Sequence, residues 1–386
     1  MTQLKAILAV LFLALAQSPN PRLPNFDRAI ALEEKAETTA NASLGDLDGD
    51  GYPDIVLAKG RHWPLVDLVL LNDGHGRFNR RRNVSDQADR SYTAALADLN
   101  GDGSLDLVVG NDAPDKKVIY FNDGKGNFTL AGTFGDARWP TRNVGVADLN
   151  GDGRPDIVVA NRSEDRPGAN YICMNNGRGL FPSCSAFSTE SATTTASGDI
   201  NGDGFADLVV PHRDGGQSYL YINDGHGAFG DRHPFGPANA ETRAIALGDL
   251  NGDGRVDIII GDQARGGAFV YLNQRDMKFS DAVTIAGKED TVYCMAVADM
   301  NSDGHTDIVL GNSEAPGAVL INDGTGRRFT RIRFGDGQGT VYGLALGDIN
   351  GDGSPDIVAA RSDAPSMLYL NSAQLKASPA RRQRPN

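Results

Sequence analysis

The chain repeats one acidic segment seven times, and this repeat constrains the fold more than any other feature. The first copy, residues 46–54, reads DLDGDGYPD. The copies start 52, 50, 51, 50, 50 and 49 residues apart, at Asp46, Asp98, Asp148, Asp199, Asp249, Asp299 and Asp348. A fixed period of this length marks an array of units that bury their faces against their neighbours. The 386 residues therefore predict one domain of seven units rather than two or three separate domains.

Each unit contains four short apolar segments and no helical periodicity. In the second unit these segments are residues 92–99, 105–110, 118–122 and 128–134, separated by Asp-Gly and Asn-Gly turns. This pattern predicts a four-stranded antiparallel meander. Four strands in a repeat of about 50 residues are typical of a propeller blade. The expected fold is thus an all-β, seven-bladed β-propeller.

The two ends of the chain complement each other. The last unit stops after its third strand, at residues 367–371, and lacks a fourth. Residues 26–32 begin 20 residues before Asp46, just as Phe78 and Phe128 lie 20 residues before Asp98 and Asp148. We therefore expect this N-terminal strand to complete the last blade and close the ring, so that the propeller spans residues 26–371.

The remaining segments predict export. Residues 1–16 contain one lysine, an apolar run of about 11 residues and a final Ala-Leu-Ala, which is typical of a secretory signal cleaved after Ala16. We expect a secreted protein, extracellular or periplasmic, and no membrane span, because no other long apolar stretch follows. Residues 372–386 form a polar tail whose role, like the oligomeric state, the sequence leaves open.

The three cysteines differ in their surroundings. Cys173 and Cys184 flank an Asn-Gly turn and could face each other on adjacent strands. Export would permit a disulfide, but spacing alone leaves the pairing open. Cys294 lies in an apolar strand pattern, and we expect it to be a buried free thiol.

The acidic segments carry oxygen ligands at positions 1, 3, 5 and 9, with a backbone carbonyl available at position 7. Oxygen-only ligation in a flexible loop favours calcium over zinc or copper. A glycine at position 6 allows the sharp turn in every copy. The predicted metal ligands are Asp46, Asp48, Asp50, Asp54, Asp98, Asn100, Asp102, Asp106, Asp148, Asn150, Asp152, Asp156, Asp199, Asn201, Asp203, Asp207, Asp249, Asn251, Asp253, Asp257, Asp299, Asn301, Asp303, Asp307, Asp348, Asn350, Asp352 and Asp356. Up to seven structural Ca²⁺ ions are expected.

An alternative is that these turns merely satisfy their own backbone, as Asp, Asn and Gly often do. Without a cation, however, the repeated carboxylates would crowd like charges together. The loops hold 22 carboxylates, and seven divalent ions would offset the formal charge of −13. The acidity therefore reflects metal ligands, and no clustered basic face predicts nucleic-acid binding. Position 12 lacks the glutamate of an EF-hand, so the sites should be weak and suit extracellular calcium.

With these motifs the chain resembles the FG-GAP or VCBS repeat family, the calcium-binding propellers of integrin alpha-chain heads and many secreted bacterial proteins. The name-giving pieces occur at residues 134–135, 235–236 and 334–335 (Phe-Gly) and at 110–114 and 311–316 (Gly-Asn…Ala-Pro). The resemblance covers residues 26–371 and implies calcium between the first and second strands of each blade. Unlike integrins, the chain has calcium motifs in all seven units.

The loops on the face opposite the acidic segments vary between units, and binding sites tend to lie on such loops. Equivalent positions in a ring should converge on a shared mouth. The candidate ligand-binding residues are Trp63, Tyr92, Trp139, Arg142, His212, Arg243, Tyr293, Tyr342 and Arg361. The alternative is that these side chains are ordinary rim residues.

Three functions fit this pattern. Aromatic residues with Arg and His suit a glycan or an extracellular protein partner, as in a lectin or an adhesion module. A second hypothesis is a polysaccharide lyase or other carbohydrate-active enzyme on the same face, although the sequence shows no nucleophile elbow, zinc set or carboxylate pair apart from the acidic loops. A third is a purely structural surface protein.

Overall fold

The structure, a computed structural model, describes residues 23–163 and 168–372. The predicted signal at residues 1–16 and nearly all of the predicted tail lie outside these residues. The described chain is almost entirely β-strand, with one short 3₁₀ helix, η1 (Arg275–Met277). Within it, no helix has the length and apolar character needed to cross a membrane.

Twenty of the strands form five separate four-stranded sheets. In each sheet consecutive strands pair antiparallel, as expected for a meander. The second unit contains β6 (Ser91–Ala97), β7 (Asp106–Asn111), β8 (Lys117–Asn122) and β9 (Phe128–Phe134), and the third contains β10 (Thr141–Ala147), β11 (Asp156–Asn161), β12 (Asn170–Cys173) and β13 (Cys184–Ser188). The fourth contains β14 (Ala196–Gly198), β15 (Asp207–Val210), β16 (Gly216–Ile222) and β17 (Asp231–Ala240), and the fifth contains β18 (Thr242–Gly248), β19 (Asp257–Asp262), β20 (Ala268–Tyr271) and β21 (Val283–Ala286). The sixth contains β22 (Val292–Ala298), β23 (Asp307–Asn312), β24 (Gly317–Asn322) and β25 (Phe329–Phe334). The sequence prediction for the second unit is confirmed to within one or two residues.

The sixth sheet has eight strands and joins the two ends of the described chain. Its strands are β1 (Arg28–Ala31), β2 (Glu37–Gly45), β3 (Asp54–Lys59), β4 (Leu68–Leu71), β5 (Arg80–Asn83), β26 (Thr340–Gly347), β27 (Asp356–Ala364) and β28 (Met367–Leu370). β1 pairs antiparallel with β28, placing Arg28 opposite Leu370. β2 and β27 pair over only two positions, Glu37 with Ala364 and Thr38 with Ser362.

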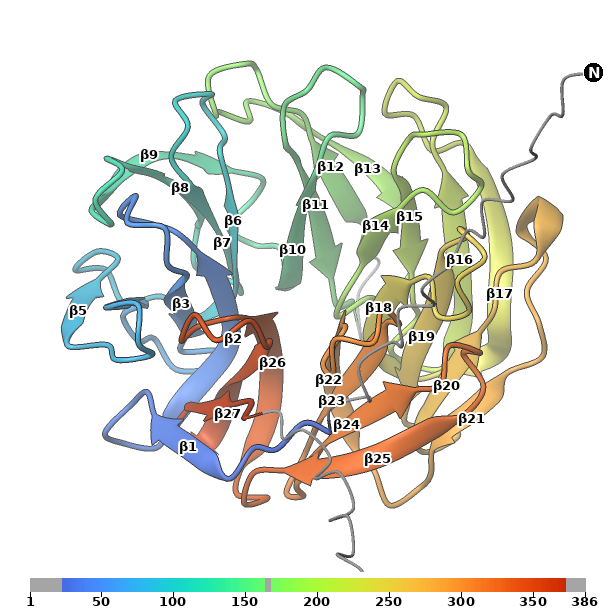
Figure 1. Cartoon of the computed structure of the whole chain (residues 1–386). Coiled ribbons are helices and arrows are strands. Elements are labelled where there is room, and N and C mark those ends of the chain that lie inside the picture. Colours follow the sequence, from blue (N-terminus) through green and yellow to red (C-terminus); the bar gives the residue numbers. More distant parts are fainter. Residues whose placement is uncertain (1–22, 164–167, 373–386) are drawn as a thin grey trace, which may run out of the picture.

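The sheets stand around a common centre, with the first strand of each unit innermost (Figure 1). β6 contacts β2 and β10, and the same relation continues through β14, β18 and β22 to β26, which contacts β2 in turn. The outermost strands face solvent, as the largely exposed β1 and β5 show. This is the arrangement of a β-propeller.

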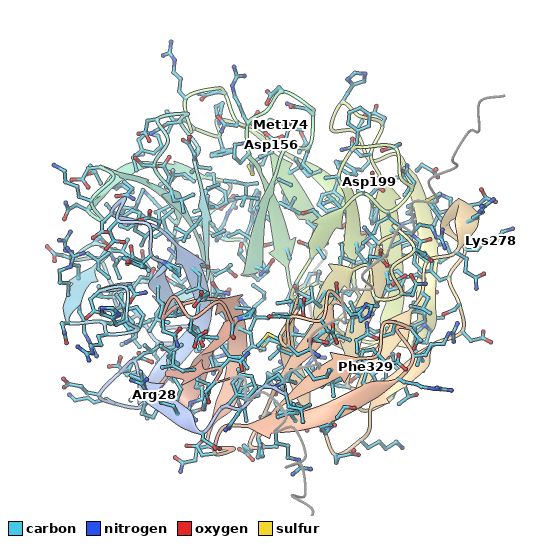
Figure 2. All side chains as sticks on the ribbon, viewed as in Figure 1. Arg28, Asp156, Met174, Asp199, Lys278 and Phe329 are labelled. Atoms are coloured by element: carbon cyan, nitrogen blue, oxygen red, sulfur yellow. A yellow bond between two sulfur atoms is a disulfide. The ribbon has the colours of Figure 1, made fainter. Side chains whose placement is uncertain are left out.

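The core consists of apolar layers between neighbouring sheets, and side chains fill these spaces (Figure 2). In β3, Ile55 and Leu57 pack against the strands of the last unit, whereas Val56 and Ala58 pack against the second unit. Alternate side chains of a strand point to opposite faces, and here both faces are covered. The central residues of the second strands are therefore apolar on both faces instead of alternating with polar residues.

A disulfide joins Cys173 on β12 to Cys184 on β13, which face each other in the strand register. The sequence had left this pairing open. The bond links the third and fourth strands of one sheet, between cysteines 11 positions apart in the sequence.

A buried carboxylate precedes β4. Asp67 accepts the Lys59 backbone N–H at 2.7 Å and the Ser91 hydroxyl at 2.9 Å. Burial, with the nearby Asp89 carboxylate adding to it, raises the pKa of Asp67 to about 7, although the two hydrogen bonds and the Lys59 ammonium oppose the shift.

The shift predicts a pH-dependent stability. Between about pH 4 and pH 7 the unfolded chain has lost the Asp67 proton while the folded chain keeps it, so the free energy of unfolding falls as pH rises. The slope reaches about 1.4 kcal/mol per pH unit and vanishes above pH 7. We expect Asp67→Asn to remove this contribution and to be more stable than the parent above pH 7.

Urea unfolding of both proteins from pH 4 to pH 8 measures the difference in their free energies of unfolding. The contributions of the other carboxylates are the same in both proteins and cancel in this difference. Asn170 occupies the equivalent position of the third unit, because it lies five residues before Asn175 just as Asp67 lies five residues before Asn72. An amide is therefore compatible with this site. Parallel pH curves for the two proteins would contradict the prediction.

Candidate functional site

The acidic loops connect the first and second strands of each unit and share one backbone geometry. In the first loop, Asp46 accepts the backbone N–H groups of Gly49 at 2.7 Å, Asp50 at 3.2 Å and Gly51 at 2.9 Å. Gly51 lies at φ +87°, which favours glycine. The second, third, fourth, fifth and seventh loops repeat these three bonds. The first aspartate thus folds each loop around itself.

The first loop also gathers carboxylates around one point. One ligand atom from each of Asp46, Asp48 and Asp50 lies within 4.8 Å of the others. Asp48 Oδ1 is buried with no hydrogen-bond partner, while its Oδ2 pairs with Arg80. An orphaned carboxylate oxygen among other oxygens fits a hard cation such as Ca²⁺.

In the other six loops an asparagine replaces the second aspartate. Asn100 donates from Nδ2 to Asp102 Oδ2 at 2.9 Å, and its Oδ1 accepts the Asp102 backbone N–H at 2.8 Å. The amide therefore relieves part of the carboxylate crowding, and it still supplies an oxygen. The donor set remains oxygen-only, which fits the same class of cation.

The last aspartate of each loop is fully buried at the start of the second strand. Asp106 accepts the Leu99 backbone N–H at 3.1 Å with one oxygen and the Asn122 backbone N–H at 2.9 Å with the other. Burial raises the pKa of this carboxyl to about 6, against the two hydrogen bonds. A carboxylate has about four acceptor positions, so these bonds leave capacity for a metal.

The asparagine that ends each third strand links neighbouring units. Asn122 donates from Nδ2 to Leu47 O of the first unit at 2.9 Å and to Leu105 O of its own unit at 3.1 Å, and its Oδ1 accepts the N–H groups of Gly124 and Gly126. We call this set the latch asparagines; each donates to the preceding unit's loop, and they are Asn72, Asn122, Asn175, Asn223, Asn273, Asn322 and Asn371. These contacts place the acidic loops and the turns that follow the third strands on one face.

A cavity of about 300 Å³ opens among the innermost strands, where they begin on the other face. All seven residues six positions before a first aspartate line it: Ala40, Tyr92, Arg142, Thr193, Arg243, Tyr293 and Tyr342. Five of the nine candidate ligand-binding residues are among them: Tyr92, Arg142, Arg243, Tyr293 and Tyr342.

Aromatic rings and arginines stack around the cavity wall. The guanidinium carbon of Arg142 lies 4.5 Å from the centroid of the Tyr92 ring, and that of Arg243 lies 4.2 Å from Tyr293. The Tyr293 and Tyr342 rings meet edge to face at 5.2 Å. Such cation–π contacts hold the guanidinium groups against the rings.

The repeats identify the family. The FG-GAP-like repeat matches six times, at residues 46–109, 98–159, 148–210, 199–260, 249–310 and 299–359. These overlapping matches cover well over half of the sequence. The chain belongs to the FG-GAP-like repeat family. No curated protein matches this FG-GAP-like chain in sequence.

Solved structures share the FG-GAP-like fold at low identity. A lectin from Agrocybe aegerita, described as recognising non-reducing terminal N-acetylglucosamine, is 21% identical with a TM-score of 0.58, over 85% of this chain and 87% of the lectin. BBS1N, solved in complex with ARL6DN, is 13% identical with a TM-score of 0.60, over 92% and 100%. The extracellular domain of a hybrid two-component system from B. thetaiotaomicron is 14% identical with a TM-score of 0.56, over 92% of this chain and 40% of that one. At these identities the similarity shows the fold alone.

Four of the nine predicted ligand-binding residues lie away from this cavity of the FG-GAP-like domain. Arg361 is buried and pairs with Asp336 at 2.6 Å, and His212 packs on Gly216. Positions at the end of the second strand therefore face neighbouring loops rather than the centre. Trp63 is 70% exposed outside the lining.

Trp139 also serves packing rather than the cavity. Its ring stacks on Tyr171 at a centroid distance of 3.8 Å, within the apolar layer between the second and third units. A sequence cannot reveal which loop tryptophan will find an aromatic partner in the next unit. This stacking accounts for its absence from the cavity lining.

The sequence analysis missed three basic side chains of the cavity lining: Arg61, His62 and Arg162. They follow the second strands by one to three residues, so a search shifted slightly past the chosen position would have found them. Arg61 lies with its guanidinium carbon 3.8 Å from the Tyr342 ring centroid. His62 lies 3.3 Å from the Tyr92 hydroxyl, and burial together with Arg61 and Arg142 lowers the pKa of its imidazole.

Cys294 was expected to be a buried free thiol. It is free, but it is only partly buried and lines the cavity, with its thiol 3.3 Å from the Val341 carbonyl. The first strands are not covered at the centre of the ring, so an apolar pattern there does not guarantee burial. Desolvation raises the pKa of the thiol, which disfavours the reactive thiolate.

Proposed function

We propose that this protein is a secreted, calcium-binding β-propeller that binds a glycan or an extracellular protein at the central cavity. The observation that carries the proposal is the wall of stacked tyrosines and arginines around a space of about 300 Å³. Tyrosine faces pack on sugar rings, and arginine forks bind their hydroxyl and acidic groups. The similarity to a lectin that recognises N-acetylglucosamine supports a binding module.

The proposal includes up to seven structural Ca²⁺ ions in the acidic loops. The residues that would hold them are the side chains at positions 1, 3, 5 and 9 of each loop. A bound divalent ion would neutralise the carboxylates that face each other, as in the first loop, where Asp48 Oδ1 has no partner. The calcium would therefore stabilise the scaffold while the other face binds the ligand.

We also infer seven blades and a closed ring. The eight-stranded sheet divides into two meanders, β2–β5 and β26–β28 with β1, joined by only two paired positions. Asn72 donates across this junction to Ile349 O at 2.8 Å. An apolar layer continues between these two units as it does between the others. A crystal structure with six blades, or with a gap at this junction, would contradict the inference.

Glycan-array binding with matched variants tests the function. We expect the secreted protein to bind a defined glycan class and Tyr342→Ala to weaken this binding about tenfold, since stacking area in the cavity is lost. Tyr219→Ala is the control, because Tyr219 also stacks under an arginine, Arg232, outside the cavity. Equal glycan binding by the two variants would contradict the proposal that the ligand binds in the cavity.

The array is read with calcium and with a chelator, and circular dichroism monitors folding in parallel. Binding that is lost together with the fold carries no information on direct participation of the ion. Absorbance from unsaturated products, if it grew steadily on uronate polysaccharides and vanished in Tyr342→Phe, would redirect the assignment to a lyase.

A further inference from the structure

The cavity is cationic although the chain is acidic, with a formal charge of −13. Its lining contains no Asp or Glu among the described residues but includes four arginines, Arg61, Arg142, Arg162 and Arg243. Asp112 pairs with Arg142 at 2.5 Å, and Asp214 pairs with Arg162 at 2.7 Å. In the described part of the chain no carboxylate pairs with Arg61 or Arg243. The cavity therefore keeps two positive charges without an anionic partner.

These two arginines are held in place by rings rather than by acids. Only 9% of the Arg61 surface is exposed, and its guanidinium carbon lies 3.8 Å from the Tyr342 centroid. Arg243 lies on Tyr293 in the same way, and the two rings touch edge to face. The Nε atoms of Arg61 and Arg243 are both buried with no hydrogen-bond partner.

Burying a guanidinium without a partner is unfavourable, whereas an oxyanion would satisfy both its charge and its N–H groups. We propose that Arg61 and Arg243 bind the anionic group of a sugar-sized ligand, with a hexuronate as the simplest case. This inference rests on the proposed binding function and specifies its ligand class. The volume is at the lower end of that of ligand sites, which suits one small molecule or the terminal residue of a chain.

Calorimetric titration with three sugars tests the charge requirement. Methyl glucuronoside and methyl glucoside share one ring and differ in the carboxylate at C6, and methyl glucoside 6-sulfate carries the other common oxyanion. We expect both anions to bind at least about tenfold more tightly than the neutral sugar, with affinities that fall as salt rises. The ratio of the two anions distinguishes a uronate ligand from a sulfated one.

Charge-removing variants locate the binding group. Arg61→Met and Arg243→Met keep an apolar stem on the tyrosine ring, and each is expected to weaken glucuronoside binding at least about tenfold. Arg61→Lys should lose less, because it keeps the charge but not the fork. The matched control is Arg265→Met, since Arg265 stacks on Phe269 at 3.5 Å outside the cavity and its loss should leave affinity unchanged.

Thermal unfolding of each variant separates loss of binding from loss of folding. Two results together would overturn the anion proposal: equal affinity for the charged and neutral sugars, and the same affinities in folded Arg61→Met and Arg243→Met. They would leave the proposal of glycan binding at the cavity intact. Folded methionine variants that lose glucuronoside binding but keep binding to a neutral glycan would support it. Binding that is insensitive to Tyr342→Ala would instead contradict the proposed function itself.

Discussion

Removal of divalent cations is expected to lower the free energy of unfolding by about 5–12 kcal/mol relative to the protein in about 2 mM calcium. The estimate assumes seven independent sites with dissociation constants of about 10⁻⁴ to 10⁻³ M, as in extracellular calcium modules. The physical reason is the crowding of carboxylates, most severe in the first loop, where three acidic ligand atoms lie within 4.8 Å of one another. Urea unfolding with calcium and with a chelator measures the change.

Metal counting on single-loop variants tests whether the loops are the sites. Asp46→Ala is expected to lower the calcium stoichiometry by one, measured by equilibrium dialysis. Asp73→Ala is the control, because Asp73 is an exposed carboxylate that also accepts backbone N–H groups, from His75 and Arg77, but lies in the hairpin turn. A folded protein whose stability is unaffected by chelation, or variants with identical stoichiometry, would contradict calcium binding by these loops.

Asn122→Ala is expected to cost about 3–5 kcal/mol of stability. The variant leaves four groups without their hydrogen-bond partner: the carbonyl oxygens Leu47 O and Leu105 O, and two N–H groups of the turn. Each buried polar group left without a partner costs about 1–3 kcal/mol, and water will replace some of these bonds. Urea unfolding in constant calcium measures the loss.

Two further variants sharpen this test. Asn127→Ala removes an exposed asparagine of the same turn and should cost less than about 1 kcal/mol. Asn72→Ala should cost as much as Asn122→Ala, because Asn72 bonds Ile349 O at the junction of the first and last units. A much smaller cost at Asn72 than at Asn122 would contradict the closed ring.

The position within the repeat decides which candidate residues line the cavity. The positions six residues before each first aspartate all reach the cavity, because every unit repeats the same strand length and turn. His212 and Arg361 stand at a second repeated position, five residues after the last aspartate of their loops, and the structure packs or pairs them elsewhere, as it does Trp139. The latch asparagines were missed, although an asparagine recurs at or just after the end of each third strand and precedes Asp-Gly in four of the seven units.

The sequence by itself determined the features that depend on local spacing: the repeating unit, its four strands, the acidic loops and the complementary ends of the chain. These follow from the period of apolar residues and from turn chemistry within about ten residues. Only the tertiary structure decided which side chains meet across units, such as Arg61 on Tyr342 and Asn72 on Ile349 O. Such contacts join residues far apart in the chain, and their partners depend on how neighbouring sheets pack rather than on any local pattern.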